Sequence, residues 1–227
     1  MARCSDGIGE RTDWSVLMVC TGNLCRSPMA ERLAGARLGR LTVAAGLPGA
    51  PEPSVLVRSA GVRAFTGGPM EPTAAAVLRE RGADDTGFRS RQVTPAMVAA
   101  ADIVLCATRA HRVRIVEMAP RAVRRTFTLR EFARLAEAVT PSRIDRLAAE
   151  VAGRHPSGRL RAAGMALGVA SAGARGVAPP DDPADDDLDD PLGGGLDDFR
   201  ACADAIEAAL ESLDRLLAAL LAATAPS

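Results

Sequence analysis

Short apolar runs alternate with segments of helical periodicity along most of this chain. Four runs rich in Val, Leu and Ile predict strands, at residues 14–19, 55–61, 102–106 and 125–129. Apolar spacing, Pro and Gly signals predict helices between and after them, at residues 28–40, 71–82, 109–118 and 130–138. The first strand is apolar at almost every position, which is typical of a strand covered on both faces. The alternation predicts an α/β fold: a single doubly wound parallel sheet of four strands with helices on both faces.

A longer helix is predicted for residues 196–223. Its apolar positions lie three and four residues apart, at Phe199, Cys202, Ile206, Leu210, Leu213, Leu217 and Leu220. Such a stripe predicts that one face of the helix packs against the sheet. The polar face is mostly Asp and Glu, whereas a helix lying on a membrane would carry Lys or Arg there.

Breaks in the pattern predict the domain organisation. Residues 1–13 mix both charges and are interpreted as a loose N-terminal arm, and residues 14–227 as one domain. Residues 153–180 are rich in Gly, Ala, Ser and Arg, and 144–151 could form a short helix, so we interpret residues 140–187 as a poorly ordered insertion. Its uncharged run, 162–174, is too short to span a bilayer and is interpreted as flexible linker.

Composition and charge narrow the class of partner and the compartment. The 28 basic residues are all Arg, 28 acidic residues balance them, and only 3% of residues are aromatic, so neither a nucleic-acid nor a membrane partner is expected. The absence of Lys excludes a Walker A loop. Five irregularly spaced Cys and an N-terminus without a signal-peptide pattern predict a cytoplasmic protein without a disulfide framework. The oligomeric state stays open.

Candidate chemistry lies directly after the first strand, in the segment Cys20-Thr21-Gly22-Asn23-Leu24-Cys25-Arg26-Ser27-Pro28. A tight loop that enters a helix points backbone N–H groups inward, and the helix dipole adds positive charge, so the loop suits a phosphate-sized oxyanion. Both the dipole and Arg26 favour the thiolate of Cys20, which is the nucleophilic form of the side chain. The guanidinium of Arg26 can hold an oxyanion in a planar fork. Ser27 can donate a hydrogen bond to the thiolate.

This segment resembles the signature of the low-molecular-weight protein tyrosine phosphatase family, an apolar strand followed by Cys-x-Gly-Asn-x-Cys-Arg-Ser-Pro-x-Ala-Glu. The resemblance implies a flavodoxin-like strand order 2-1-3-4 and a phosphatase domain that hydrolyses phosphotyrosine-type phosphomonoesters of proteins through a cysteinyl-phosphate. It implies Cys20 as nucleophile and Arg26 as transition-state ligand, with residues 21–27 binding phosphate and no metal or organic cofactor. It also assigns to Ser59, in Ser59-Ala60-Gly61, support of the loop through Asn23.

The family places its general acid in an Asp-Pro pair just before the last helix. Two pairs compete here, Asp182-Pro183 and Asp190-Pro191, within a run that holds seven Asp in residues 181–190. The second precedes Leu192-Gly193-Gly194, which is similar to the relatives' Asp-Pro-aromatic-Gly-Gly. We therefore choose Asp190. An acidic run is usually a solvated, self-repelling tether, and a calcium loop is a weak second interpretation because the required spacing is missing.

Several positions depart from the family or leave alternatives open. Phe88 stands where many relatives carry a His, so the network around Asn23 is expected to be weaker or differently built, and Leu192 replaces a substrate-stacking aromatic. Cys25 is expected to protect Cys20 as a redox partner by forming a disulfide. His111, amid Arg residues, is interpreted as solvated.

Three alternative functions remain. The first is a protein-arginine phosphatase, whose relatives carry Thr at the position of Leu24. The second is an arsenate reductase, which would need a further Cys pair where only Cys106 is found. The third is a non-catalytic phospho-residue binder or redox sensor, against which the presence of both Cys20 and Asp190 argues.

Overall fold

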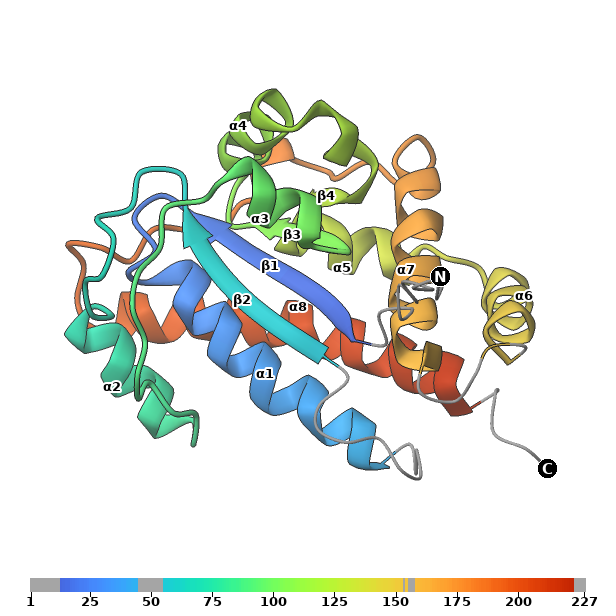
Figure 1. The fold of residues 1–227 in the computed structure, drawn as a ribbon, viewed down its shortest axis with the longest axis horizontal. Coiled ribbons are helices and arrows are strands. Elements are labelled where there is room, and N and C mark those ends of the chain that lie inside the picture. The colour runs from blue at the N-terminus through green and yellow to red at the C-terminus, as the bar shows by residue number, and fades with distance from the viewer. Residues whose placement is uncertain (1–12, 45–54, 153, 155–157, 223–227) are drawn as a thin grey trace, which may run out of the picture.

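The computed structural model describes residues 13–44, 55–152, 154 and 158–222 (Figure 1). Its elements are, in chain order, β1 (Trp14–Cys20), α1 (Arg26–Ala44), β2 (Val55–Gly61), α2 (Pro72–Glu80), α3 (Pro95–Ala100), β3 (Ile103–Cys106), α4 (Arg109–Met118), the 3-10 helix η1 (Pro120–Arg125), β4 (Thr126–Thr128), α5 (Leu129–Glu137), α6 (Pro141–Ala152), α7 (Arg159–Ala174), the 3-10 helix η3 (Pro183–Asp186) and α8 (Leu196–Ala222). The N-terminal arm predicted for residues 1–13 lies, except for its last residue, outside the described residues.

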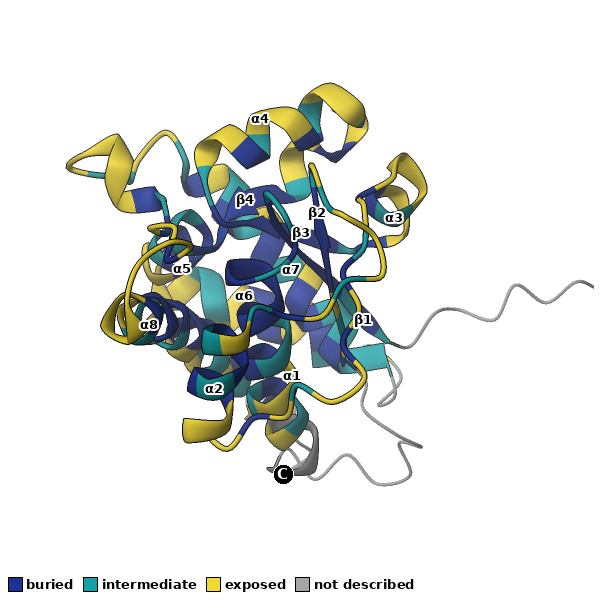
Figure 2. Cartoon of the chain, turned by 90° about the vertical axis from the view of Figure 1, so that its left-hand side faces the viewer, coloured by how far each residue is buried: buried dark blue, intermediate teal, exposed yellow. Residues whose placement is uncertain are grey.

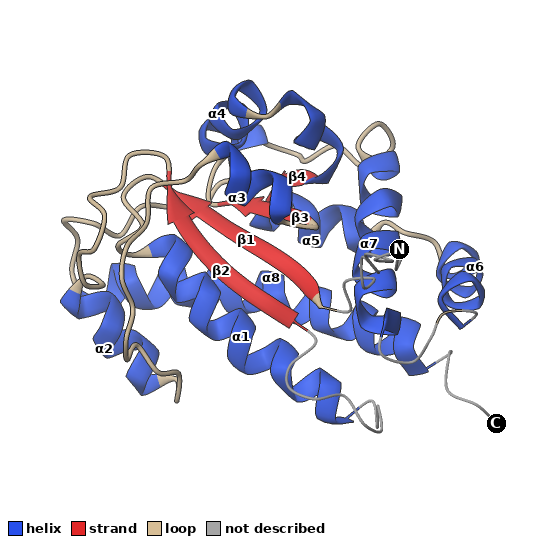
Figure 3. Ribbon diagram, in the orientation of Figure 1, coloured by secondary structure: helices blue, strands red, loops and turns tan. Residues whose placement is uncertain are grey.

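The four strands form one sheet in the order β2-β1-β3-β4, and all three pairings are parallel (Figure 3). The predicted fold class and strand order are therefore confirmed. Each predicted strand and each of the helices predicted at 28–40, 71–82, 109–118, 130–138 and 196–223 is present, with ends shifted by a few residues at most.

The sheet is buried on both faces because β1 sends alternate side chains into two cores. Val16 and Met18 contribute to the larger core, which the helices α1, α5, α7 and α8 cover. Leu17 and Val19 contribute to a smaller core with residues of α3 and α4. Figure 1 shows α1 and α8 on one side of the sheet and α3 and α4 on the other. The strands between them are mostly buried, dark blue in Figure 2, except for the first half of the edge strand β2. A strand covered in this way needs apolar residues at nearly every position.

The expectation of poor order in residues 140–187 is wrong for the residues that the structure describes, because they form α6, which includes the short helix expected at 144–151, and α7. Helix α7 is rich in Gly, which lowers intrinsic helix propensity. Gly164 and Gly168 lie one turn apart on the face that meets the sheet: a Cβ on Gly164 would overlap the indole ring of Trp14, and one on Gly168 would touch Ile103. The small residues therefore let the helix pack closely, and tertiary packing outweighs the low propensity.

Two arginines tie α7 to the rest of the domain. At its start, Arg161 donates to both carboxylate oxygens of Asp102, at 2.8 and 3.1 Å. Just after its end, Arg175 stacks on the ring of Phe127 at 4.2 Å and donates to Glu131 at 2.8 Å. The chain that follows leads to the acidic run and then to α8, so the helix sets where that run begins.

None of the helices within the described ranges is both long and apolar enough to cross a membrane.

Candidate active site

The loop between β1 and α1 is shaped by Asn23. Its φ angle is 55°, in the left-handed region that Asn tolerates better than most residues. The buried side chain donates to Ser27 Oγ at 2.9 Å and to Ser59 Oγ at 2.8 Å, and its Oδ1 accepts from the backbone N–H of Arg91 at 2.8 Å. These three hydrogen bonds hold the loop in a conformation that the backbone alone would not favour. The structure thus joins Asn23 and Ser59, as the resemblance implies.

The side chain of Phe88 takes no part in these hydrogen bonds. Phe88 is buried in the core. The amide of Arg91 satisfies Asn23, and Ser59 Oγ donates to the carboxylate of Glu31. The support of the loop therefore comes from a backbone amide and a residue of α1.

The end of β2 lies directly against the loop. The backbone N–H groups of Val62 and Arg63 donate to the carbonyls of Cys20 and Thr21, both at 2.9 Å. A Cβ on Gly61 would lie 2.5 Å from the Thr21 carbonyl oxygen, so only Gly allows this approach.

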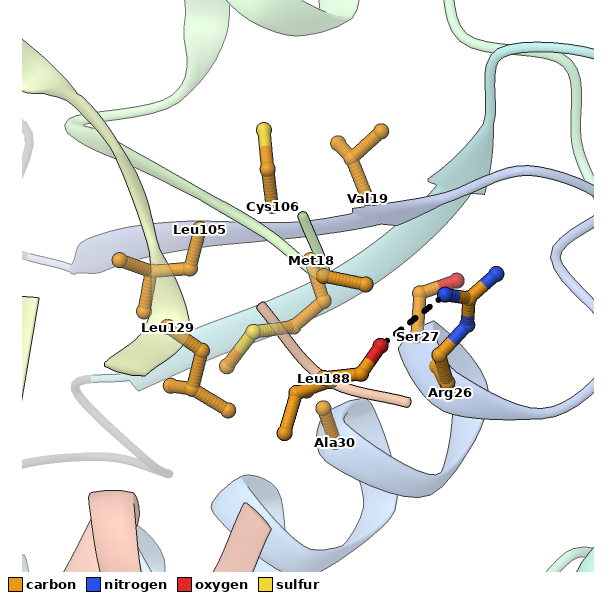
Figure 4. Close-up of a pocket in the computed structure, with 10 residues that line it drawn as sticks. Met18, Val19, Arg26, Ser27, Ala30, Leu105, Cys106, Leu129 and Leu188 are labelled. Carbon is orange, nitrogen blue, oxygen red and sulfur yellow. Dashed lines mark hydrogen bonds between the residues drawn. The ribbon is translucent and has the colours of Figure 1, made fainter. Parts of the chain in front are cut away.

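The candidate nucleophile and the candidate anion ligand lie at the two ends of the loop. Cys20 ends β1 and its Sγ lies 3.0 Å from Ser27 Oγ. Because Ser27 Oγ already accepts from Asn23, its own hydrogen can be donated to the thiolate. Arg26 begins α1 and is buried, and its Nη1 donates to the carbonyl of Leu188 at 3.2 Å. Both residues line a small, mostly apolar pocket (Figure 4).

The structure brings Asp190, and not Asp182, to this loop. Asp190 Oδ2 lies 2.5 Å from Arg26 Nη2, and its other oxygen accepts from the N–H of Leu192 at 3.3 Å. The Asp190 side chain is 47% exposed, so it can meet a substrate as well as Arg26. Asp182 instead accepts from Ala184 N at 2.8 Å and caps η3.

The acidic run is an ordered and partly buried segment, and not the solvated tether that such runs usually form. Asp186 is buried and accepts two hydrogen bonds from Arg134, at 3.1 and 2.9 Å. Asp187 accepts from the N–H of Arg109 at 2.7 Å, and Leu188 N donates to the carbonyl of Ala107 at 2.8 Å. These contacts hold the segment against α5, the start of α4 and Ala107, the residue after β3, just before Asp190. Sequence reasoning missed Arg134, because nothing in its local sequence pairs it with a carboxylate 52 residues away.

The interpretation of His111 as solvated is wrong. The side chain is buried, and its Nε2 lies 2.8 Å from the hydroxyl of Thr21, the residue after Cys20. Burial, reinforced by the charge of Arg26, lowers the pKa of His111 to about 4. The helix start at Thr108 turns the ring towards the loop, which the local charge pattern did not reveal.

The described cysteines are all free and buried. Burial, with the nearby carboxylate of Glu71, raises the pKa of Cys25 to about 12, and burial raises the pKa of Cys202 to about 12 and that of Cys106 further. These three side chains therefore stay neutral thiols at neutral pH. Among the described residues, no cluster of three or more His, Cys, Asp or Glu side chains could hold a metal ion.

Two apolar side chains are exposed near the ends of the strands. Leu192, just after Asp190, is 58% exposed, and Phe65, four residues after Gly61, is 84% exposed. The loop that carries Phe65 is fixed, since its carbonyl accepts from Ser90 Oγ at 2.5 Å. Leu24 in the phosphate loop is only partly buried and packs against the edge of the larger core.

The fold and this site define an open parallel α/β sheet in which the loop from β1 to α1 starts at a buried Cys and ends at a buried Arg. The family model described as "Low molecular weight phosphotyrosine protein phosphatase" matches residues 15–141, more than half of the chain. The chain belongs to the low molecular weight phosphotyrosine protein phosphatase family.

Individual relatives carry two different names. The probable low molecular weight protein-tyrosine-phosphatase EpsP of Ralstonia nicotianae is 34% identical over 117 residues, which is 52% of this chain and 71% of that protein. The protein-arginine-phosphatase of Geobacillus stearothermophilus is 39% identical over 119 residues, again 52% of this chain and 71% of the relative. Among solved structures, the YwlE arginine phosphatase from Geobacillus stearothermophilus superposes with a TM-score of 0.57 and 29% identity, covering 89% of this chain and 91% of that one.

Proposed function

We propose that this protein is a protein phosphatase that hydrolyses phosphotyrosine-type phosphomonoesters through a cysteinyl-phosphate. The observation that carries the proposal is the convergence of three groups: Cys20 next to Ser27 Oγ, Arg26 at the other end of the loop, and Asp190 at 2.5 Å from the guanidinium. A nucleophile, a fixed cation and an acid at one anion-binding loop are the parts that phosphoryl transfer through cysteine requires.

In the first step, the thiolate of Cys20 attacks phosphorus, the P–S bond forms, and the bond to the leaving oxygen breaks. Asp190 gives its proton to that oxygen, while Arg26 and the loop amides at residues 21–27 stabilise the charge on the phosphoryl oxygens. In the second step, water attacks phosphorus and Asp190 takes its proton. The P–S bond breaks, inorganic phosphate leaves, and the thiolate is restored. In the free enzyme the hydrogen bond from Arg26 Nη2 to Asp190 Oδ2 keeps Asp190 at the loop.

The substrate class is the least constrained part of the proposal, because relatives named for phosphotyrosine and for phosphoarginine are similarly close. Leu24 supports the aromatic substrate, since an apolar branched side chain in the loop offers no hydrogen bond to a guanidinium. Exposed Phe65 offers an apolar surface for a substrate ring, whereas Leu192 provides no aromatic stacking face after Asp190. Protein-arginine phosphatase activity is the second candidate.

The decisive experiment compares four substrates with one enzyme: p-nitrophenyl phosphate, a phosphotyrosine peptide, a phosphoarginine peptide and arsenate. We expect turnover of the aryl phosphate and a higher kcat/KM for phosphotyrosine than for phosphoarginine, with Leu24→Thr narrowing the gap. Cys20→Ser and Arg26→Ala should each abolish turnover while the variants keep their fold by circular dichroism. Faster hydrolysis of phosphoarginine would overturn the substrate class, and an inactive wild-type enzyme would leave a phospho-residue binder as the function.

We propose a cytoplasmic location on the basis of the irregular cysteine pattern and the four described free thiols. Cell fractionation with an antibody against the chain tests this location, and recovery from the secreted or membrane fraction would contradict it.

A further inference from the structure

His111 links the start of α4 to the loop between β1 and α1, residues 20–26, which we call the phosphate loop. Its Nε2 lies 2.8 Å from Thr21 Oγ1, and its Nδ1 lies 2.7 Å from Thr108 Oγ1. The Thr108 hydroxyl also caps α4, accepting from the backbone N–H of His111 at 3.3 Å. The contact of Nδ1 with the capping residue Thr108 thus sets the position of the ring, and Nε2 contacts Thr21, the residue after Cys20.

The imidazole is neutral at neutral pH. Burial, helped by the positive charge of Arg26, lowers the pKa of His111 to about 4, and the carboxylates of Asp190 and Asp187 oppose this shift more weakly. A neutral ring has one N–H donor and one acceptor nitrogen. The direction of the two hydrogen bonds that link Thr108, His111 and Thr21 therefore depends on which ring nitrogen carries the hydrogen.

The contacts of the two hydroxyls distinguish the tautomers. Thr21 Oγ1 also lies 3.5 Å from Arg26 Nη2, a group that only donates, and the same nitrogen holds Asp190. If Nδ1 carried the hydrogen, Thr108 Oγ1 would accept from both Nδ1 and the backbone, and its own hydrogen could be donated only to solvent, because the described residues offer it no further acceptor. If Nε2 carries it, the Thr108 hydroxyl donates to Nδ1 and Nε2–H donates to Thr21.

We propose that His111 is a positioning residue that, through its Nε2–H, orients the Thr21 hydroxyl as a donor to the anion in the phosphate loop. With His111 and Arg26 both donating to Thr21 Oγ1, the one hydrogen of that hydroxyl is left for a phosphoryl oxygen. This inference rests on the proposed phosphatase function and adds a side-chain donor to the backbone donors of the loop. A hydrogen bond to a group that gains negative charge in the transition state accelerates the reaction by about 10- to 100-fold.

The first test is spectroscopic and does not depend on turnover. Long-range 1H–15N spectra of the full chain distinguish a protonated from an unprotonated ring nitrogen, and the chain has only two His residues, so His155→Ala assigns the signals. We expect the Nε2–H form of His111 with inorganic phosphate bound. The Nδ1–H form, or a charged imidazolium at neutral pH, would overturn the proposal.

The second test is a double-mutant cycle measured with p-nitrophenyl phosphate. Thr21→Val keeps the side-chain shape and removes the hydroxyl, and His111→Phe keeps a ring and removes both nitrogens. Each should lower kcat by about 10- to 100-fold with a smaller change in KM, and the double variant should be no worse than either single variant. His111→Gln, whose amide can donate from a position close to that of Nε2, should recover part of the loss, whereas the shorter His111→Asn should not.

Two results would contradict the positioning role. One is multiplicative loss in the double variant, which would show that the two residues act independently. The other is a fall in melting temperature in His111→Phe without a fall in kcat, which would make His111 structural only. If His111→Phe does not fold, kcat of Thr21→Val and the wild-type spectrum still decide. An inactive wild type would refute the proposed function, whereas an active wild type with unaffected variants would refute only this inference.

Discussion

Replacing Asn23 separates the two ways in which this residue stabilises the phosphate loop. Asn23→Gly removes three hydrogen bonds of 2.8–2.9 Å but allows the φ angle of 55° without strain. At about 1 kcal/mol net for each bond, we expect a loss of roughly 3 kcal/mol. Asn23→Ala loses the same bonds and also forces a Cβ into the left-handed region, which should cost about 1 kcal/mol more.

The order of these two variants is the informative result. At an ordinary helical position, Ala is more stable than Gly by about 0.5–1 kcal/mol, and Ala208→Gly on the exposed side of α8 provides that control. At position 23 the order should reverse. Urea titrations followed by circular dichroism measure the three differences, provided that the slope m is unchanged.

Two outcomes would refute this reasoning. If Asn23→Ala is as stable as Asn23→Gly or more stable, the left-handed backbone is not a constraint on the loop. If Asn23→Gly loses less than about 1 kcal/mol, the hydrogen bonds do not contribute as the distances indicate. Both variants should also lose most phosphatase activity, since the loop amides would no longer be held in one arrangement.

Three further predictions concern the candidate acid Asp190, the thiol of Cys25 and the packing of helix α7. Asp190→Asn should slow aryl phosphate hydrolysis by roughly 10²–10⁴-fold, whereas Asp182→Asn should leave kcat nearly unchanged; the reverse order would mean that the wrong Asp-Pro pair was chosen. After peroxide treatment, dithiothreitol should restore the wild type more fully than Cys25→Ser. Burial raises the pKa of Cys25 to about 12, so its thiolate fraction increases tenfold per pH unit, and its disulfide with oxidised Cys20 should form roughly tenfold faster per pH unit between about pH 7 and 9. A pH-independent rate, or equal recovery of the wild type and Cys25→Ser, would contradict the protective role. Gly164→Ala places a Cβ against the indole ring of Trp14 and should lower the free energy of unfolding by about 1–3 kcal/mol. The control Gly173→Ala, with open space around the new Cβ, should not destabilise the protein. Equal effects of the two variants would show that α7 does not pack closely.

The sequence by itself determined the sheet and the reactive loop, because both depend on local pattern. The continuous apolar run of β1 requires cover on both faces, and strands alternating with helices imply parallel pairing. The segment from Cys20 to Pro28 contains the candidate nucleophile, the buried Arg26 and the turn residues within one stretch of chain. The residues that follow the two Asp-Pro pairs favour Asp190 over Asp182 as the acid, and the structure brings the carboxylate of Asp190 to Arg26.

Only the tertiary structure decided the features that depend on residues far apart in the chain. Helix α7 has weak intrinsic propensity, and Gly164 fits there because the indole ring of Trp14 occupies the space that a side chain would need. The acidic run is ordered because Arg134, on another helix, neutralises buried Asp186. His111 is surrounded by Arg in sequence, but the end of β3 and the cap of α4 bury it against Thr21. In each case the local sequence alone predicts an exposed or unstructured segment. A residue far away in the chain, which only the fold brings close, supplies the contact that buries or orders that segment.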